Sequence, residues 1–227
     1  MTDVLDLPVA ESLRDRHTHL ARHRGRVSGY RPEVASFLTL PLDPTPDDWA
    51  DLAALVGPGE VADLYSLPVV APAGWEPVFH LPGLQLVAGP LAALGAGPEV
   101  VELGAADVPE MLELAARTRP GPFWAETPSM GRYVGVRDAG VLVAMAGERL
   151  SPPGWTEVSA VCTAPEARGR GLAARLVTAV ADGIRARGDG VFLHVVSANT
   201  TALGVYERLG FTVRREVVFH GYRVPTA

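Results

Sequence analysis

The 227-residue sequence has a single cysteine, no excess of positive charge and no long apolar run. Cys162 therefore cannot form a disulfide within the chain. The formal net charge of −6 disfavours nucleic acid or an anionic membrane as main partner, because phosphate contacts need clustered positive charge. Every apolar stretch ends well short of the roughly eighteen residues that cross a bilayer. With no secretory pattern at the N-terminus, we expect a cytoplasmic protein that binds neither membrane nor nucleic acid.

The first hundred residues carry few functional signals. An Arg- and His-rich segment, residues 14–26, is interpreted as a solvated helix. His19 and His23 have a spacing that can hold a metal, but no carboxylate or cysteine accompanies them in register. We therefore predict no metal site.

Proline and glycine divide this first part into short pieces. Thr45 and Pro46 predict the start of a helix that ends near Gly57. Apolar pieces at 67–71 and 84–88 are interrupted by prolines, which indicates short or edge strands.

Gly and Pro punctuate residues 89–98, and we place a domain boundary there. This divides the chain into an N-terminal α/β subdomain, 1–98, and a second domain, 99–227. No sequence repeat is visible, although the first part could be a diverged structural copy of the second.

From Val101 onward the pattern is regular. Residues 101–103 predict a strand, and Asp107 begins a helix that ends before Pro120. Residues 132–137 and 141–146 form two strand-like runs joined by a hairpin turn.

A possible anion site follows. Residues 155–163 predict a strand that leads, through a turn with Gly169 and Gly171, into a helix closed by Gly188. Glycines at such a turn let a phosphate approach the first N–H groups of the helix. The turn has neither the Gly-Lys-Ser/Thr of a P-loop nor the third glycine of a dinucleotide site. Taken alone, it could equally be an ordinary tight turn.

The elements after this helix add a candidate ligand face. Residues 191–196 form a continuous apolar run, typical of a central strand, and Asn199 precedes a short helix over 200–209. Asn199, Ala202 and Tyr206 lie on one side of that helix. On the strand 155–163, alternation places Glu157 with Ser159, Val161 and Thr163 on one face and Cys162 on the other.

The sequence resembles the GNAT superfamily of acyl-CoA-dependent N-acyltransferases over about residues 100–227. Two stretches carry the resemblance, Val161-Cys162-Thr163-Ala164-Pro165-Glu166-Ala167-Arg168-Gly169-Arg170-Gly171-Leu172-Ala173 and Asn199-Thr200-Thr201-Ala202-Leu203-Gly204-Val205-Tyr206-Glu207-Arg208-Leu209-Gly210-Phe211. It implies an α/β (α+β) fold, with a mixed, mostly antiparallel sheet flanked by helices and containing a splayed parallel strand pair.

The resemblance also implies roles for single residues. The strand at Val161 and Thr163 would pair with the pantetheine arm of acetyl-CoA or another acyl-CoA, and Asn199 and Ala202 would face the same arm. The pyrophosphate would be held by Arg168, Gly169, Arg170, Gly171, Leu172 and Ala173. Tyr206 would protonate the departing thiolate, and Glu157 is the best carboxylate candidate for the base, although an acidic residue near a strand's start is often only ion-paired.

These implications predict an N-acyltransferase, acetyl in the first instance, that acts on a primary amine of a small molecule or peptide by direct attack. Two alternatives remain. One is a non-catalytic acyl-CoA-binding sensor or structural protein of the same fold. The other, nucleic-acid binding through the Arg- and His-rich segment, is disfavoured by the net charge. The sequence does not identify the acceptor amine.

Overall fold

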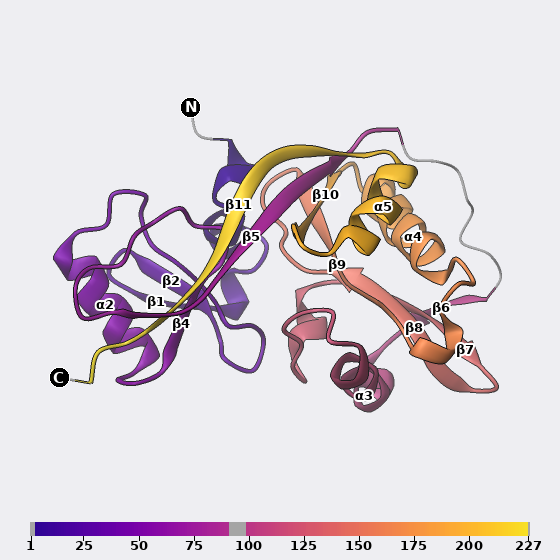
Figure 1. Ribbon diagram of the computed structural model, residues 1–227, viewed down its shortest axis with the longest axis horizontal. Helices are drawn as coiled ribbons and strands as arrows, with labels where there is room; N and C mark the ends of the chain where they lie inside the picture. Colours follow the sequence, from indigo (N-terminus) through magenta and orange to yellow (C-terminus); the bar gives the residue numbers. More distant parts are fainter. Residues whose placement is uncertain (1–2, 91–98, 227) are drawn as a thin grey trace.

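The computed structural model describes residues 3–90 and 99–226 of the chain (Figure 1). In its first part the α-helices and strands are α1 (Pro8–Arg14), β1 (Ala21–Arg24), β2 (Val27–Tyr30), β3 (Phe37–Thr39), α2 (Pro46–Val56), β4 (Val61–Leu64) and β5 (Glu76–Ala88). In its second part they are β6 (Val100–Leu103), α3 (Val108–Thr118), β7 (Tyr133–Asp138), β8 (Val141–Glu148), β9 (Trp155–Thr163), α4 (Leu172–Ala186), β10 (Gly190–Val196), α5 (Thr200–Leu209) and β11 (Phe211–Arg223). Short 3-10 turns are η1 (Val4–Asp6), η2 (Thr18–Leu20), η3 (Ala105–Asp107), η4 (Thr127–Met130) and η5 (Pro165–Ala167).

The strands form one mixed sheet in the order β1-β2-β3-β4-β11-β5-β10-β9-β8-β7-β6. Only β3 with β4 and β9 with β10 pair in parallel within the described ranges, and the other neighbours are antiparallel. This confirms the predicted α+β fold with a mixed, mostly antiparallel sheet. In residues 3–90 and 99–226, no helix is long and apolar enough to cross a bilayer.

The parallel pair β9–β10 is short. It runs from Trp155 opposite Gly190 to Glu157 opposite Phe192, and beyond that pair the two strands no longer bond to each other. We call the Glu157–Phe192 pair the vertex of the splay. The predicted splayed pair is therefore present, and Glu157 lies where the two strands begin to diverge.

Two long strands are exchanged between the parts of the chain. β5, from the first part, lies between β10 and β11, whereas β11, from the end of the chain, also pairs with β4. Figure 1 shows the two strands side by side as they cross from one part of the molecule to the other. Leu86 of β5 is accordingly buried in the core of the second part.

The two parts share an order of elements. β1-β2-β3-α2-β4-β5 corresponds to β7-β8-β9-α4-β10-β11, with α5 added before the last strand. In the sheet, the first part reads β1-β2-β3-β4-β11-β5 from one end, and the second part reads β7-β8-β9-β10-β5-β11 from the other. The two orders are the same when each strand is replaced by its counterpart. The predicted boundary, residues 89–98, lies mostly outside the described residues. The division at residue 98 stays a prediction, and the sheet itself is continuous across it.

Several sequence predictions are confirmed. Helix α2 begins after a capping box in which Thr45 and Asp48 bond to each other's backbone, and it ends at Gly57. The hairpin β7–β8 turns through Ala139 and Gly140, both with positive φ. Helix α5 covers the predicted residues and is closed by Gly210.

The predicted helix over residues 14–26 is wrong. Helix α1 ends at Arg14, and residues 21–24 form β1, which pairs with β2. His17 is buried between these elements, where its ring bonds to the Tyr30 hydroxyl at 2.7 Å and the Met130 carbonyl at 3.0 Å. These tertiary contacts outweigh the local helical pattern.

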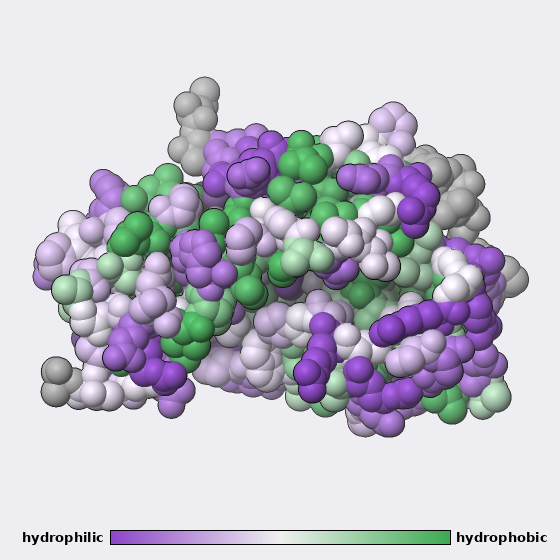
Figure 2. All heavy atoms as spheres, in the orientation of Figure 1, coloured by the Kyte–Doolittle hydropathy of each residue, from purple (hydrophilic) through white to green (hydrophobic). Residues whose placement is uncertain are grey.

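The strand predictions in the first part need two corrections. Residues 67–71 form no strand, and 84–88 belong to the 13-residue β5 at the centre of the sheet. Pro77 and Pro82 lie where β5 pairs with β11 on one side and β10 has already ended. A missing N–H is tolerated there because one edge of the strand is open. Figure 2 shows apolar atoms at the surface along β5 and β11, where Val78, Leu81 and Val213 are exposed.

Candidate functional site

The turn before α4 has the geometry of an anion site. Gly169 and Gly171 adopt positive φ values of 79° and 74°, and a Cβ at either position would meet no atom within 4 Å. The two glycines therefore let the backbone bend sharply beneath open space. No described backbone oxygen accepts a hydrogen bond from the amides of residues 169–174. Since Gly171, the N-cap of α4, has no side chain, these donors remain available to a ligand.

The arginines of this turn are exposed. Arg170 pairs with Asp138 at 2.6 Å, and the Arg168 Nε lies 3.4 Å from the Thr163 carbonyl. The buried Thr163 hydroxyl has no hydrogen-bond partner among the described residues. The first group of predicted coenzyme residues, between Val161 and Ala173, thus lies on one stretch of chain from the end of β9 into the first turn of α4.

Helix α5 presents the second group of predicted residues. The Asn199 Oδ1 accepts a hydrogen bond from the Ala202 amide at 3.1 Å, so Asn199 caps the helix. Tyr206, two turns later, is 8% exposed and packs edge-on against Phe211 at 5.8 Å. Burial raises the pKa of Tyr206 to about 12, with smaller effects from Arg149 and Glu157. The phenol is protonated at physiological pH and can act as a proton donor.

Glu157 is fully buried at the vertex and is surrounded by donors. Its two carboxylate oxygens accept hydrogen bonds from Arg149, each at 2.8 Å, and His194 of β10 donates to it at 2.6 Å. Burial alone would raise the pKa of Glu157, but Arg149 and His194 outweigh it and lower the pKa to about 2. A carboxylate held in this way is a weak base.

The alternation predicted for β9 is wrong beyond Ser159. Ala146 of β8 faces both Ala160 and Val161, and Ala160 has a positive φ of 52°. This β-bulge inserts one residue, so side chains before and after it do not share one alternating pattern. Cys162 is buried beside Thr118 of α3, and burial raises its thiol pKa.

A buried polar chain links the vertex to the N-terminus. Arg214 donates to the Gln85 Oε1 at 2.7 Å, and the Gln85 amide lies 2.8 Å from the Leu5 carbonyl and 3.1 Å from His194 Nε2. Because the Gln85 amide donates, His194 Nε2 accepts, and the proton sits on Nδ1, facing Glu157. Burial lowers the pKa of His194. The histidine is therefore neutral and its lone pair is occupied.

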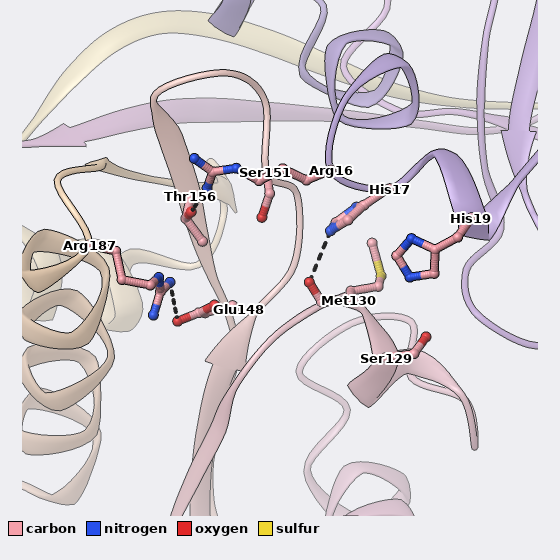
Figure 3. Close-up of a pocket in the computed structure, with 9 residues that line it drawn as sticks. All are labelled: Arg16, His17, His19, Ser129, Met130, Glu148, Ser151, Thr156 and Arg187. Carbon is pink, nitrogen blue, oxygen red and sulfur yellow. Dashed lines mark hydrogen bonds and ion pairs between the residues drawn. The ribbon is translucent and has the colours of Figure 1, made fainter.

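A separate surface cavity of about 240 Å³ lies at the junction between the two parts of the chain (Figure 3). Among its lining residues are Arg16, His17, His19, Glu148, Thr156 and Arg187. None of the predicted site residues lines it, and Thr156 places it at the closed end of the β9–β10 pair. Its charges are already paired, Arg187 with Glu148 and Arg16 with Asp189. His17 is held neutral there, since burial lowers its pKa to about 4.

Known proteins resemble this chain in both sequence and structure. Residues 133–220 match the model of the family described as FR47-like protein. The chain is 37% identical to the N-alpha-acetyltransferase RimI of Mycobacterium tuberculosis, over 51% of this chain and 81% of that protein. It is 30% identical to an uncharacterized protein of Mycobacterium leprae over 91% of this chain, and spans 62% of that protein's length.

Solved structures agree. An acetyltransferase assigned to the GNAT family from Novosphingobium aromaticivorans superposes with a TM-score of 0.90 at 40% identity, covering 99% of this chain and all of that one. The chain belongs to the GNAT family. A GCN5-related N-acetyltransferase from Kribbella flavida shares the fold over 99% of this chain, with a TM-score of 0.64 at 20% identity.

Around the predicted site residues of this GNAT protein lie side chains that its sequence did not reveal. Arg149 and His194 hold Glu157, but no motif marks them, because their role depends on contacts between β8, β9 and β10. The run 191–196, interpreted above as continuously apolar, in fact contains His194, and this one polar residue was the available signal. The groups that form metal sites are not gathered anywhere in residues 3–90 and 99–226.

Proposed function

We propose that this GNAT protein is an N-acetyltransferase that transfers the acetyl group of acetyl-CoA to a primary amine by direct attack. The observation that carries the proposal is the row of amides over residues 169–174, which donate to no described backbone oxygen and lie beneath open space at the start of α4. Backbone donors at a helix N-terminus suit the pyrophosphate of the coenzyme. The exposed guanidinium groups of Arg168 and Arg170 add local positive charge.

The remaining coenzyme contacts follow the family pattern. Val161 and Thr163 at the open end of β9 would pair with the pantetheine arm, with Asn199 and Ala202 across the splay. The orphan hydroxyl of Thr163 supports a ligand at this place. Gly169, Gly171, Leu172 and Ala173 would hold the pyrophosphate.

Tyr206 is proposed as the general acid that meets the departing thiolate. Relative to a thiol pKa of about 8.5, a phenol with a pKa of about 12 makes full proton transfer uphill by about 5 kcal/mol. A hydrogen bond from the phenol already stabilises the developing charge. Its burial keeps water away from that bond.

Glu157, the predicted base, is proposed to act mainly by holding the vertex. With its pKa near 2, removal of a proton from an alkylammonium of about 10.4 would cost about 11 kcal/mol. The amine would instead lose its proton to water before it attacks. The sequence predicted that Glu157 is the general base. The pH dependence of kcat in Glu157→Gln distinguishes that role from the structural one.

The acceptor class is proposed to include peptide α-amines, because two relatives carry the name N-alpha-acetyltransferase. One is RimI, described above, and the other is N-alpha-acetyltransferase 20 of Dictyostelium discoideum, which is 36% identical over 42% of this chain and 56% of that protein. Small-molecule amines remain the other class. The rival function is a non-catalytic acyl-CoA sensor, which would need the ring of Tyr206 for packing against Phe211 but not the proton of its hydroxyl.

Thiol release from acetyl-CoA, measured across a panel of small amines and short peptides, tests the proposal. We expect turnover with at least one amine and saturable binding of coenzyme A in calorimetry. Tight coenzyme A binding without thiol release, together with unchanged coenzyme A binding in Tyr206→Phe, would support the function as a non-catalytic sensor. Absence of coenzyme binding would exclude both.

A further inference from the structure

Tyr133, the first residue of β7, carries a buried hydroxyl without a hydrogen-bond partner among the described residues. The residue is only 2% exposed. Buried hydroxyls are almost always paired, because an unpaired one costs stability. A phenol kept in this state suggests a partner that is present only while the protein works.

The ring of Tyr133 lies across β8. Tyr133 pairs with Gly147, and a Cβ on that glycine would approach the ring atoms Cδ1, Cε1 and Cγ to between 2.3 and 2.5 Å. Only glycine fits beneath the ring. Gly147 in turn pairs with Ser159 of β9. Since neighbouring strands are about 4.8 Å apart, the ring carries its hydroxyl past β8 toward β9, between the vertex and the bulge.

The orientation of the ring is fixed. Phe123, in the segment after α3, packs edge-on against it, with centroids 5.8 Å apart and planes at 77°. With Gly147 beneath the ring and Phe123 beside it, the side chain has little room to change χ1 and so to move its hydroxyl toward another protein group. The partner therefore has to come to the hydroxyl.

Tyr133 also shares its electrostatic surroundings with the proposed acid. Burial is the main reason that the pKa values of Tyr133 and Tyr206 are raised, and Arg149 and Glu157 act on both. Tyr206 belongs to α5, which follows β10, whereas Tyr133 belongs to β7, on the other side of β9 in the sheet order. The two phenols therefore come from elements on opposite sides of β9.

We propose that the Tyr133 hydroxyl binds the acceptor, donating a hydrogen bond to a carbonyl oxygen adjacent to the reacting amine, as in the first residue of a peptide. The coenzyme contacts proposed above lie on β9 at its divergence from β10, at the start of α4 and on α5, which leaves the side of β9 that faces β8 and β7 to the acceptor. A protonated phenol needs an oxygen lone pair, and the lone pair of the amine is engaged in attack. This inference rests on the proposed acetyl transfer and narrows its acceptor class.

The test measures the wild-type full chain and its Tyr133→Phe variant with two acceptors. One acceptor is a short peptide with a free α-amine, and the other is an alkylamine without a carbonyl. For the variant we expect KM for the peptide to rise about tenfold, the value of one neutral hydrogen bond. KM for the alkylamine and for acetyl-CoA stays unchanged. Because the variant removes an unpaired buried hydroxyl, its melting temperature stays equal or rises.

Tyr30→Phe is the matched control. Its hydroxyl is buried but bonded to His17 at 2.7 Å, so this variant should lose thermal stability and keep its KM values. Equal KM for the peptide in wild type and Tyr133→Phe, or an equal rise for both acceptors, would overturn the inference while acetyl transfer stands. A wild-type chain that releases no thiol with any amine would overturn both.

Discussion

At the scale of single residues, Tyr206 gives a direct test of the proposed chemistry. Tyr206→Phe removes only the hydroxyl, and the ring can keep its packing against Phe211. We expect kcat to fall about a hundredfold, as for loss of a general acid, with KM for acetyl-CoA changed by less than about twofold. Steady-state thiol release measures both constants.

The pH dependence offers a second readout of the same residue. Because burial raises the pKa of Tyr206 to about 12, the wild-type rate should not decline between about pH 9 and 10, where an ordinary phenol ionises. A falling limb near pH 10 that Tyr206→Phe abolishes would contradict the buried environment. A Tyr206→Phe enzyme as fast as wild type would contradict the acid role.

Glu157 makes a prediction about stability. Its folded pKa is lowered to about 2, so its contribution to stability is complete above the ordinary value of about 4.3 and is lost as pH falls toward 2. Glu157→Gln leaves Arg149 buried without a charged partner, and we expect a loss of about 3–5 kcal/mol at neutral pH. Urea titrations from about pH 6 to pH 3 should show a flatter profile for the variant.

The same variant separates the two roles of Glu157. If the residue holds the vertex, the acidic limb of kcat keeps its midpoint in Glu157→Gln, although the rate drops. A limb that disappears with the substitution would restore Glu157 as the base.

The sequence identified Tyr206, Asn199 and the glycine turn because these residues stand in two local motifs. Arg149, His194 and Tyr133 have no such context. Their importance arises from which strands lie next to each other, and from one glycine, Gly147, beneath a ring. The bulge at Ala160 was equally hidden, because alanine gives no signal for a positive φ.

At the scale of elements, the start of α4 can be tested against a turn with the same backbone constraint. Gly171 and Gly140 both have positive φ, 74° and 87°, and a Cβ added at either position would stand in open space. An alanine at either site should cost about 1 kcal/mol of folding stability. Only Gly171→Ala places a methyl group where the pyrophosphate is proposed to approach, so we expect coenzyme A affinity to fall at least about tenfold in calorimetry. Equal coenzyme A affinities of Gly171→Ala and Gly140→Ala would contradict the proposed pyrophosphate site at the start of α4.

The corresponding helix of the first part, α2, predicts the number of coenzymes bound. Its first turn has Pro46, which lacks an N–H, and the Thr45–Asp48 capping box occupies other donors. Arg26 pairs with Asp48 at 2.5 Å, but the turn still carries carboxylates where α4 offers bare amides. We expect one coenzyme A per chain in calorimetry, and a stoichiometry of two would contradict this difference.

Helices and hairpins were predictable where their signals are local, such as Thr45 with Pro46 or the turn at Gly140. The helix predicted over 14–26 failed because His17 serves a buried contact with Met130, far along the chain. In the sequence, β5 resembles short pieces because Pro77 and Pro82 hide its length, and only the pairing with β11 explains why they are tolerated.

At the scale of the whole molecule, the exchanged strands predict that neither part folds alone. A fragment of residues 99–227 would lack β5, which lies between β10 and β11. We expect this fragment to show no cooperative thermal transition, and to regain one when it is co-expressed with residues 1–90. A fragment that unfolds cooperatively alone would contradict the prediction.

The repeated order of elements supports a proposal for the first part. We propose that residues 1–98 are a diverged GNAT-like copy of the second part that lost its phosphate turn, kept its sheet, and exchanged its last strand with its neighbour. Sequence comparison within the chain could not reveal this, because the likeness lies in strand order rather than in residue identity. The polar chain from Arg214 through Gln85 to His194 then connects both copies at the vertex.

The crossing of β5 and β11 also has a consequence for biosynthesis. A ribosome adds roughly 5–20 residues each second, so β5 emerges on the order of ten seconds before β11 can join it. During that interval its apolar residues Val78 and Leu81 have no native neighbour on either flank. Pro77 and Pro82, which cannot donate to a foreign strand, would protect the nascent chain from aggregation while it waits for its own C-terminus.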